Sequence, residues 1–391
     1  MFSNKDLRKL IIPLVIEQLL AVTIGMADTV MVSSCGEAAV SGISLVDSIN
    51  FLLITLFSSL ATGGAVIASQ YIGRGDHKSA SLAAKQLFYA SLALSAVLGV
   101  IAVFFRKPVL NMVFGSIEAD VMAHAQIYFL LSAISYPFLA VYNAGAALFR
   151  SMGDSRTTML ISILMNTINI VGNAILIYGF QMAAAGAATA SLVSRAVGAI
   201  IITVLLLNPR RIIFYDKLHK PEIHLSMLKS ILQIGVPNGL ENSIFQIGKI
   251  LVASIVSGFG TISITANAVA GNLASLQVIP GMALGMAMIT VVGQCIGAKD
   301  YEAVKKYTKK LMLITYGVVW AMTLLMLLFS KQILSFYSLS EETTTMTMEV
   351  FIVHGICAVI VWPLAFALPN ALRAANDVRF TMIVSLLSMW I

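Results

Sequence analysis

Long apolar stretches, separated by short polar ones, run through the whole chain. Ten of them are roughly 20 to 30 residues long, enough for a helix to cross a hydrocarbon core about 30 Å thick. An eleventh begins near Phe380 and is still apolar at Ile391. A membrane β-barrel would instead show alternating segments of about ten residues. The pattern therefore predicts an all-α polytopic membrane protein, with spans at 10–33, 45–72, 86–105, 122–147, 158–179, 183–207, 228–257, 264–296, 311–329 and 345–371.

The basic residues are distributed unevenly between the loops. The N-terminal tail and the even-numbered loops carry 20 of the 25 Lys and Arg residues, and the odd-numbered loops carry three. Because loops rich in Lys and Arg stay in the cytoplasm, the N-terminus is predicted to be cytoplasmic. The twenty are Lys5, Arg8, Lys9, Arg74, Lys78, Lys85, Arg150, Arg156, Arg210, Arg211, Lys217, Lys220, Lys229, Lys299, Lys305, Lys306, Lys309, Lys310, Arg373 and Arg379.

The composition agrees with a membrane location and argues against several classes of function. Hydrophobic residues make up 59% of the 391 residues and charged residues 11%, whereas a soluble domain has about 25% charged residues. The net charge of +7 is explained by basic loops beside an anionic leaflet, so no nucleic-acid partner is expected. Cys35, Cys295 and Cys357 form no CxxC pair and predict neither a metal site nor a disulfide framework.

The second half of the chain repeats the first. Three motifs recur in the same order, displaced by 224, 224 and 223 residues. They are Pro13-x-x-x-Glu17 with Pro237-x-x-x-Glu241, Gln70-x-x-Gly73 with Gln294-x-x-Gly297, and Arg150-x-x-x-Asp154-x-Arg156 with Arg373-x-x-x-Asp377-x-Arg379. A tandem duplication of a six-helix unit follows, and an even number of helices gives both copies the same orientation. Two pseudo-symmetric six-helix bundles are predicted at 1–207 and 228–391, joined by a cytoplasmic linker at 208–227.

The duplication also predicts what the second bundle contains. The first copy continues through two helices after Arg156, whereas the second copy reaches Ile391 within one helix after Arg379. We therefore expect the second bundle to be incomplete, ending within helix 11.

Several of these motifs resemble the multidrug and toxic compound extrusion (MATE) family over the whole chain. They are Pro13 followed fifteen residues later by Asp28, Ala68-Ser69-Gln70-Tyr71-Ile72-Gly73, Leu148-Phe149-Arg150-Ser151-Met152-Gly153-Asp154-Ser155-Arg156, and Asn169-x-x-x-Asn173-x-x-x-x-Tyr178-Gly179. The resemblance implies two bundles facing each other across a cleft. It also implies antiport of H⁺ or Na⁺ against organic substrates, often cationic, aromatic or amphipathic. The chain departs from some members, which have a functional Glu where this sequence has Phe245; Glu241 comes one turn earlier.

Asp28 is the first candidate for cation coupling. A charged group at mid-bilayer is costly, about 2.5–3.5 kcal/mol on insertion scales, so its presence suggests a function. Asn169 and Asn173 are four residues apart and share one helix face, where their amides can hydrogen-bond a carboxylate or offer oxygens to a hard cation such as Na⁺. Asn143 is a further member of this predicted group. The alternatives are a structural carboxylate for Asp28 and interhelical hydrogen bonds for the amides.

Glu17, Glu241 and Lys249 are candidates for lining a substrate cavity. Glu17 lies eleven residues before Asp28, about 1100° of helix rotation and therefore nearly on the same face. Glu241 is its counterpart in the second copy, and Lys249 lies two turns further along that helix. For both acids the alternative is a role in helix packing. The role of Lys249 stays open between neutralising a carboxylate and repelling cationic substrates.

Secondary active export of organic compounds is the predicted function, carried out by a monomer in the plasma membrane without a cofactor. A flippase for a lipid-linked saccharide is the first alternative, although it would favour several cations in the cavity. A membrane-embedded enzyme is the second. It would need paired carboxylates or a metal motif, and Asp28 lies about 16 Å from Glu17 along one helix. No Walker A loop, nucleophile triad or zinc spacing occurs in the sequence, so we do not expect an enzyme.

Overall fold

The computed structural model describes residues 2–115, 118–218, 220, 222–335, 337 and 339–390. Every regular element in this part of the chain is helical. Ten of these helices are long and apolar enough to cross a membrane. The predicted all-α polytopic architecture is therefore confirmed.

The N-terminal bundle consists of six spans. Each apolar stretch read from the sequence lies inside one of them, and most helices extend beyond the apolar stretch by several polar residues. Their bounds are α1 Asn4–Ser33, α2 Glu37–Gly73, α3 His77–Phe114, α4 Ala119–Ser151, α5 Ser155–Asn173 continued by the π-helix η1 Ala174–Gly179, and α6 Ala183–Leu206.

The C-terminal bundle follows after a linker at 207–224, slightly shifted from the predicted 208–227. Its last helix, α13, is described as far as Trp390, and Ile391 lies outside the described residues, as do His219 and Pro221 of the linker. The elements are α7 Leu225–Ser257, α8 Thr261–Gly297, α9 Tyr301–Leu328, α10 Ser330–Ser335, α11 Glu341–Ile360, the π-helix η2 Pro363–Ala367, α12 Leu368–Ala374 and α13 Val378–Trp390.

Asp residues at three of the turns between helices cap the helix that follows. The side chains of Asp76, Asp154 and Asp300 accept hydrogen bonds from the backbone N–H three residues later, at 3.0, 3.2 and 2.9 Å. Such a cap contributes about 0.5–2 kcal/mol to helix stability. The preceding Gly75 and Gly153 have φ of +75° and +82°, a backbone conformation that glycine adopts without strain. The Gly-Asp pair thus ends one helix and begins the next within a tight turn.

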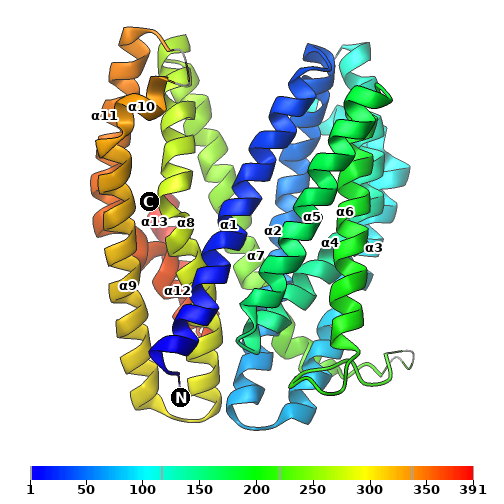
Figure 1. Ribbon diagram of the computed structural model, residues 1–391, viewed down its shortest axis with the longest axis vertical. Helices are drawn as coiled ribbons and strands as arrows, with labels where there is room; N and C mark the ends of the chain where they lie inside the picture. Colours follow the sequence, from blue (N-terminus) through cyan, green and yellow to red (C-terminus); the bar gives the residue numbers. More distant parts are fainter. Residues whose placement is uncertain are drawn as a thin grey trace.

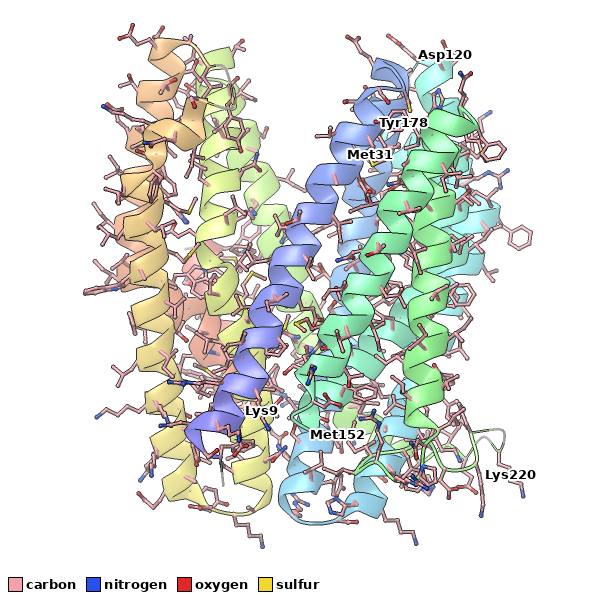
Figure 2. The ribbon with its side chains drawn as sticks, in the orientation of Figure 1. Lys9, Met31, Asp120, Met152, Tyr178 and Lys220 are labelled. Atoms are coloured by element: carbon pink, nitrogen blue, oxygen red, sulfur yellow. The ribbon has the colours of Figure 1, made fainter. Side chains whose placement is uncertain are left out.

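The N-terminus, the linker and these turns lie at one end of the helices, here called the linker end. Figure 2 shows Lys9, Met152 and Lys220 there, while Asp120 and Tyr178 lie at the opposite end. This arrangement agrees with the prediction that the tail and the even loops share one side of the membrane.

Helix α1 belongs to both bundles. Near the linker end, Leu7, Leu10 and Leu14 are buried in one apolar cluster with α8 residues such as Ala287. Further along, α1 packs against α5 of its own bundle, and Figure 1 shows it running obliquely between the two halves. A change in how α1 packs therefore acts on both bundles.

The two bundles pack against each other through a close crossing of α2 and α8. A Cβ atom added to Gly73 would lie 1.9 Å from the carbonyl oxygen of Gln294, and one added to Gly297 would lie 1.9 Å from that of Gln70. Only glycine allows this approach, which explains why both copies of the motif carry Gly three residues after Gln. The crossing closes the interface at the linker end.

Each bundle also caps a helix of the other. The Gln70 amide donates to the carbonyl oxygen of Ala374 at the end of α12, at 2.8 Å. The Gln294 amide donates to the carbonyl oxygen of Ser151 at the end of α4, also at 2.8 Å. The last carbonyls of a helix have no partner within the helix, so these side chains satisfy them across the interface. The repeated Gln is thus an inter-bundle contact.

Candidate functional site

The structure brings Asp28 together with both predicted asparagines of α5. The Asn173 amide donates a hydrogen bond of 2.6 Å to Oδ1 of Asp28, and it lies 3.5 Å from Oδ1 of Asn169. Asn169 in turn donates to the hydroxyl of Ser191 in α6, at 3.0 Å. Helices α1, α5 and α6 therefore meet at one carboxylate and two amides, as the four-residue spacing predicted.

The side-chain oxygen of Asn173 is the feature of this group that most needs a chemical explanation. The Asn173 side chain is fully buried, yet its Oδ1 accepts no hydrogen bond from any described residue. Buried polar atoms are almost always paired, so an unpaired one next to a carboxylate needs an explanation. The α-helix ends at this residue and continues as the π-helix η1, a distortion that is frequent at functional sites.

Asn143, the remaining predicted member, is separate from this group. It is half-buried in α4, and its Nδ2 has no acceptor among the described residues. No hydrogen bond in the described part of the chain joins it to Asp28, Asn169 or Asn173.

Glu17 and Glu241 are held in matching ion pairs. Glu17 binds Arg150 of α4 at 3.1 Å, and Glu241 binds Arg373 of α12 at 2.8 Å. A hydroxyl from the next helix completes each pair. Both glutamates are more than 90% buried, so in this conformation neither opens onto the space between the bundles. The geometry is that of the helix-packing alternative, and the partners were not anticipated because both arginines were assigned to loops.

Lys249 is exposed on α7. Its Nζ lies 6.0 Å from the centre of the Phe245 ring, and no described carboxylate approaches it within 4.0 Å. Phe245 packs edge-on against Phe366 of η2, with ring centres 5.5 Å apart. The ring at the family's Glu position thus joins an aromatic contact inside the C-terminal bundle.

A second intramembrane carboxylate, Asp47 of α2, was missed by the sequence reasoning. It accepts hydrogen bonds from Tyr128 at 3.0 Å and from Asn50 at 3.2 Å. Arg195 of α6 donates to the hydroxyl of Ser135 at 2.7 Å, one turn along α4 from Ser132, whose hydroxyl accepts from Asn50. The missed signal was the position of Asp47 as the third residue of the second apolar stretch, since a carboxylate within a membrane span suggests a function.

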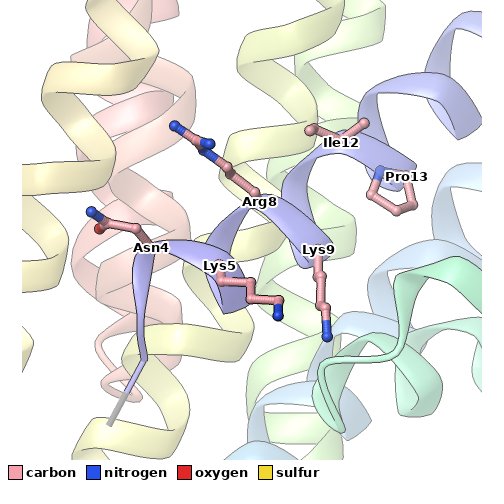
Figure 3. Close-up of a pocket in the computed structure, with 6 residues that line it drawn as sticks. All are labelled: Asn4, Lys5, Arg8, Lys9, Ile12 and Pro13. Atoms are coloured by element: carbon pink, nitrogen blue, oxygen red, sulfur yellow. The ribbon is translucent and has the colours of Figure 1, made fainter.

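A pocket of about 780 Å³ lies along the first turns of α1, far from this group. It is lined by Asn4, Lys5, Arg8, Lys9, Ile12 and Pro13 (Figure 3). Arg8 precedes Asp28 by twenty residues, about 30 Å along the helix. The pocket is therefore a basic feature of the linker end, separate from the carboxylate and amides.

Comparison with known proteins identifies the family. The sequence pattern of the MatE family matches residues 13–175 and 237–391, and the chain belongs to this family. The two matched segments begin at the duplicated prolines, Pro13 and Pro237, and thus follow the two bundles. The protein is therefore a membrane transporter of the MATE type, as the motifs indicated.

Two similar proteins illustrate the relationship. The chain is 27% identical to "Uncharacterized transporter YisQ" of Bacillus subtilis (strain 168), over 97% of this chain and 83% of that protein. It is 25% identical to "Probable multidrug resistance protein NorM" of Thermotoga maritima, over 99% of this chain and 83% of that protein.

Solved structures share the fold. "Crystal structure of MATE in the bent conformation" matches with a TM-score of 0.89 and 20% identity, over 97% of this chain and 84% of that one. "Outward-facing conformation of a multidrug resistance MATE family transporter of the MOP superfamily" matches with a TM-score of 0.88 and 20% identity, over 99% of this chain and 86% of that one.

Proposed function

We propose that this protein is a secondary active exporter of organic compounds, driven by antiport of H⁺ or Na⁺ with alternating access. The observation that carries the proposal is the buried, unpaired amide oxygen of Asn173 beside Asp28. Either cation would give that oxygen a partner. A proton on Asp28 turns the carboxyl group into a hydrogen-bond donor, and Na⁺ can be coordinated by the carboxylate and the amide oxygens of Asn173 and Asn169 together.

The position of Asp28 supports coupling to a conformational change. A ligand shifts a conformational equilibrium only by the difference in its affinity for the two states. Asp28 hydrogen-bonds to Asn173 of α5, while Leu10 and Leu14, nearer the linker end of α1, lie in an apolar cluster with α8. Neutralising the carboxylate changes the contact between α1 and α5, and α1 transmits that change to the interface between the bundles.

The substrates we propose are cationic or amphipathic organic compounds. Relatives named as multidrug resistance proteins support this class. In the N-terminal bundle, the carboxylates of Asp28 and Asp47 would attract cations. Lys249 and the aromatic contact at Phe245 are the features of the C-terminal bundle that we propose face the substrate. The proposal needs neither a cofactor nor a catalytic step, and it treats the transporter as a monomer.

We further propose that the linker end is cytoplasmic and that the protein lies in the plasma membrane. The support is the concentration of basic residues at that end. Single cysteines at Lys220 and Asp120 test this in a variant without the native cysteines. In intact cells, an impermeant thiol reagent should label the cysteine at Asp120 and leave the one at Lys220 unlabelled. Labelling in the opposite sense would refute the orientation.

The decisive experiment for coupling is Asp28→Asn in the complete protein. Purified transporter in proteoliposomes is given a proton gradient or a sodium gradient, each imposed separately, and transport of ethidium, an aromatic cation, is measured. The wild type should move ethidium against its gradient with one of the two ions. Asp28→Asn should abolish this uphill transport because Asn cannot lose a proton and carries no charge to hold a cation.

Asp120→Asn is the matched control. It removes an exposed carboxylate from the opposite end of the same bundle and should leave transport unchanged. Uphill ethidium transport at the wild-type rate by Asp28→Asn, at equal protein amounts, would refute the proposed coupling role.

A further inference from the structure

Asp47 of α2 is exposed, and hydrogen bonds hold its carboxylate in position. Its Oδ1 accepts hydrogen bonds from Tyr128 of α4 and from Asn50, one turn along α2. Asn50 is buried and is itself anchored, since its Oδ1 accepts a hydrogen bond of 2.8 Å from the hydroxyl of Tyr136. The carboxylate is therefore built into a network between α2 and α4.

Arg195 lies near both carboxylates without forming an ion pair. Its Nη1 donates to the hydroxyl of Ser135 at 2.7 Å, and no carboxylate of the described residues lies within 4.0 Å of it. Hydrogen-bonded groups nevertheless lead from it toward both carboxylates. Ser191, one turn before Arg195 on α6, accepts from Asn169 of the Asp28 group. Ser132, one turn before Ser135 on α4, accepts from Asn50, which also donates to Asp47. A cation held by a neutral hydroxyl between two anions can move toward either of them.

An apolar layer separates this group from the opposite end of the bundle. Four helical elements contribute to it, and Tyr128 packs against it. On each of these elements the layer lies about one to three turns nearer the opposite end than the polar residue of the group. Its buried members are Val32, Ile43, Ile177, Ala184 and Ala187. Of the three charged residues beside this layer, Asp28 and Arg195 are half-buried and Asp47 is exposed.

The charges of the group do not balance. Asp28 and Asp47 contribute two negative charges and Arg195 one positive charge, so the group carries a net charge of −1 with both carboxylates ionised. Charges inside a membrane are expensive, and they are stabilised when neighbouring charges compensate them. One monovalent cation, either H⁺ or Na⁺, would make the group neutral.

We infer that Arg195 and Asp47 are positioning residues that set the affinity of Asp28 for the coupling cation. With the cation at Asp28, Arg195 neutralises Asp47. Without the cation, the guanidinium group of Arg195 interacts with both carboxylates. Its positive charge then partly replaces the charge of the cation at Asp28. This inference rests on the proposed coupling role of Asp28 and assigns roles to two residues beyond it.

The inference predicts opposite effects for the two single substitutions. Arg195→Gln removes the competing positive charge, so Asp28 should bind the coupling cation more tightly. Asp47→Asn leaves one carboxylate and one guanidinium group, which neutralise each other, so the cation should bind more weakly. The double variant removes one charge of each sign and restores the net charge of −1, so its affinity should return close to that of the wild type.

The measurement is the cation concentration at half-maximal ethidium transport in proteoliposomes that contain the complete protein. In one series the Na⁺ concentration is varied at fixed pH, and in the other the pH is varied without Na⁺. The variants are compared by the half-maximal concentration of the ion that drives transport by the wild type. We expect about a tenfold decrease in this concentration for Arg195→Gln and about a tenfold increase for Asp47→Asn, within the roughly 5- to 150-fold range of coupled sites. The double variant should lie within about threefold of the wild type.

Charge-conserving variants separate electrostatics from structure. Arg195→Lys and Asp47→Glu keep the charges and should stay within about threefold of the wild type, far inside the range expected for coupled sites. If both neutralising variants shift the half-maximal concentration in the same direction, or if the double variant departs from the wild type by about tenfold or more, the inference is overturned. If Asp28→Asn still supports uphill transport, the proposed function itself fails, which is a different result.

Discussion

The two bundles share their structural contacts and differ in their charges. Each has a buried Glu–Arg pair between its first helix and the end of its fourth span, and each has a Gln that caps a helix of the other bundle. At the position related to Asp28 by the 224-residue repeat, however, the C-terminal bundle has Val252. The duplication therefore kept the contacts that hold helices together, while the carboxylate at the Asp28 position is present only in the N-terminal copy.

This contrast indicates that the two bundles have different roles. In the C-terminal bundle, η2 contributes Phe366, which stacks on Trp362 with ring centres 5.5 Å apart and meets Phe245 edge-on. The N-terminal bundle instead has the carboxylate of Asp28 and the amides of Asn169 and Asn173. Cation coupling is expected to depend on one bundle only, whereas stability and closure of the linker end should depend on both bundles.

The Glu–Arg pairs give the largest expected effect on stability. Glu17→Ala and Glu241→Ala each leave a buried arginine without its partner, which costs about 3–5 kcal/mol. Glu241→Ala should be the more destabilising, because both side chains of its pair are only 9% exposed, against 10% and 17% in the other pair. Thermal unfolding of purified protein in detergent measures the difference.

Glu302→Ala is the control for these variants. Its pair with Lys305 is exposed, so the change should alter stability by less than about 1 kcal/mol. An unfolding temperature equal to that of the wild type for either buried-pair variant would show that the pair does not stabilise the fold. It would instead favour the cavity-lining role for Glu17 and Glu241.

The glycine crossing gives the next effect. Gly73→Ala and Gly297→Ala each place a methyl group against a backbone carbonyl oxygen, at 1.9 Å before any adjustment. Overpacking of this kind costs about 1–3 kcal/mol, so the population open at the linker end should rise roughly 5- to 150-fold. Spin labels at Lys78 and Glu302, one on each bundle, report the opening by their distance distribution.

Symmetry makes this prediction strict, because both alanine variants should act alike. Gly248→Ala is the control, since nothing lies within 4 Å of a Cβ atom at that helical position. A response from only one of the two crossing glycines would mean that the bundles do not close symmetrically.

The Gln caps give the smallest effect. Gln70→Ala and Gln294→Ala each remove inter-bundle hydrogen bonds worth about 0.5–1.5 kcal/mol each, so the open population should rise roughly 2- to 10-fold. Gln70 also donates to Oδ1 of Asn376 at 3.1 Å and should therefore have the larger effect. The same spin-label distances measure it, with Gln332→Ala at the opposite end as control. A lower open population in either variant would contradict the capping role.

The sequence by itself determined the architecture. Span length is set by bilayer thickness, and the duplication can be read directly from three motifs at nearly one offset, so helix number, order and the two-bundle arrangement follow without tertiary information. The pairing of Asn169 with Asn173 could also be predicted, because helical geometry places residues four apart on one face. Asp28 stood out for a similar reason, since a carboxylate inside an apolar stretch is costly wherever its helix packs.

Only the tertiary structure decided which distant residues meet. The sequence gives the helix face of Glu17, but the position of Arg150 relative to it depends on how α4 packs beside α1, and a residue assigned to a loop lies in fact inside a long helix. Asp47 and Arg195 join Asp28 for the same reason. Their separations along the chain are long, and helix packing rather than local periodicity brings their charges together.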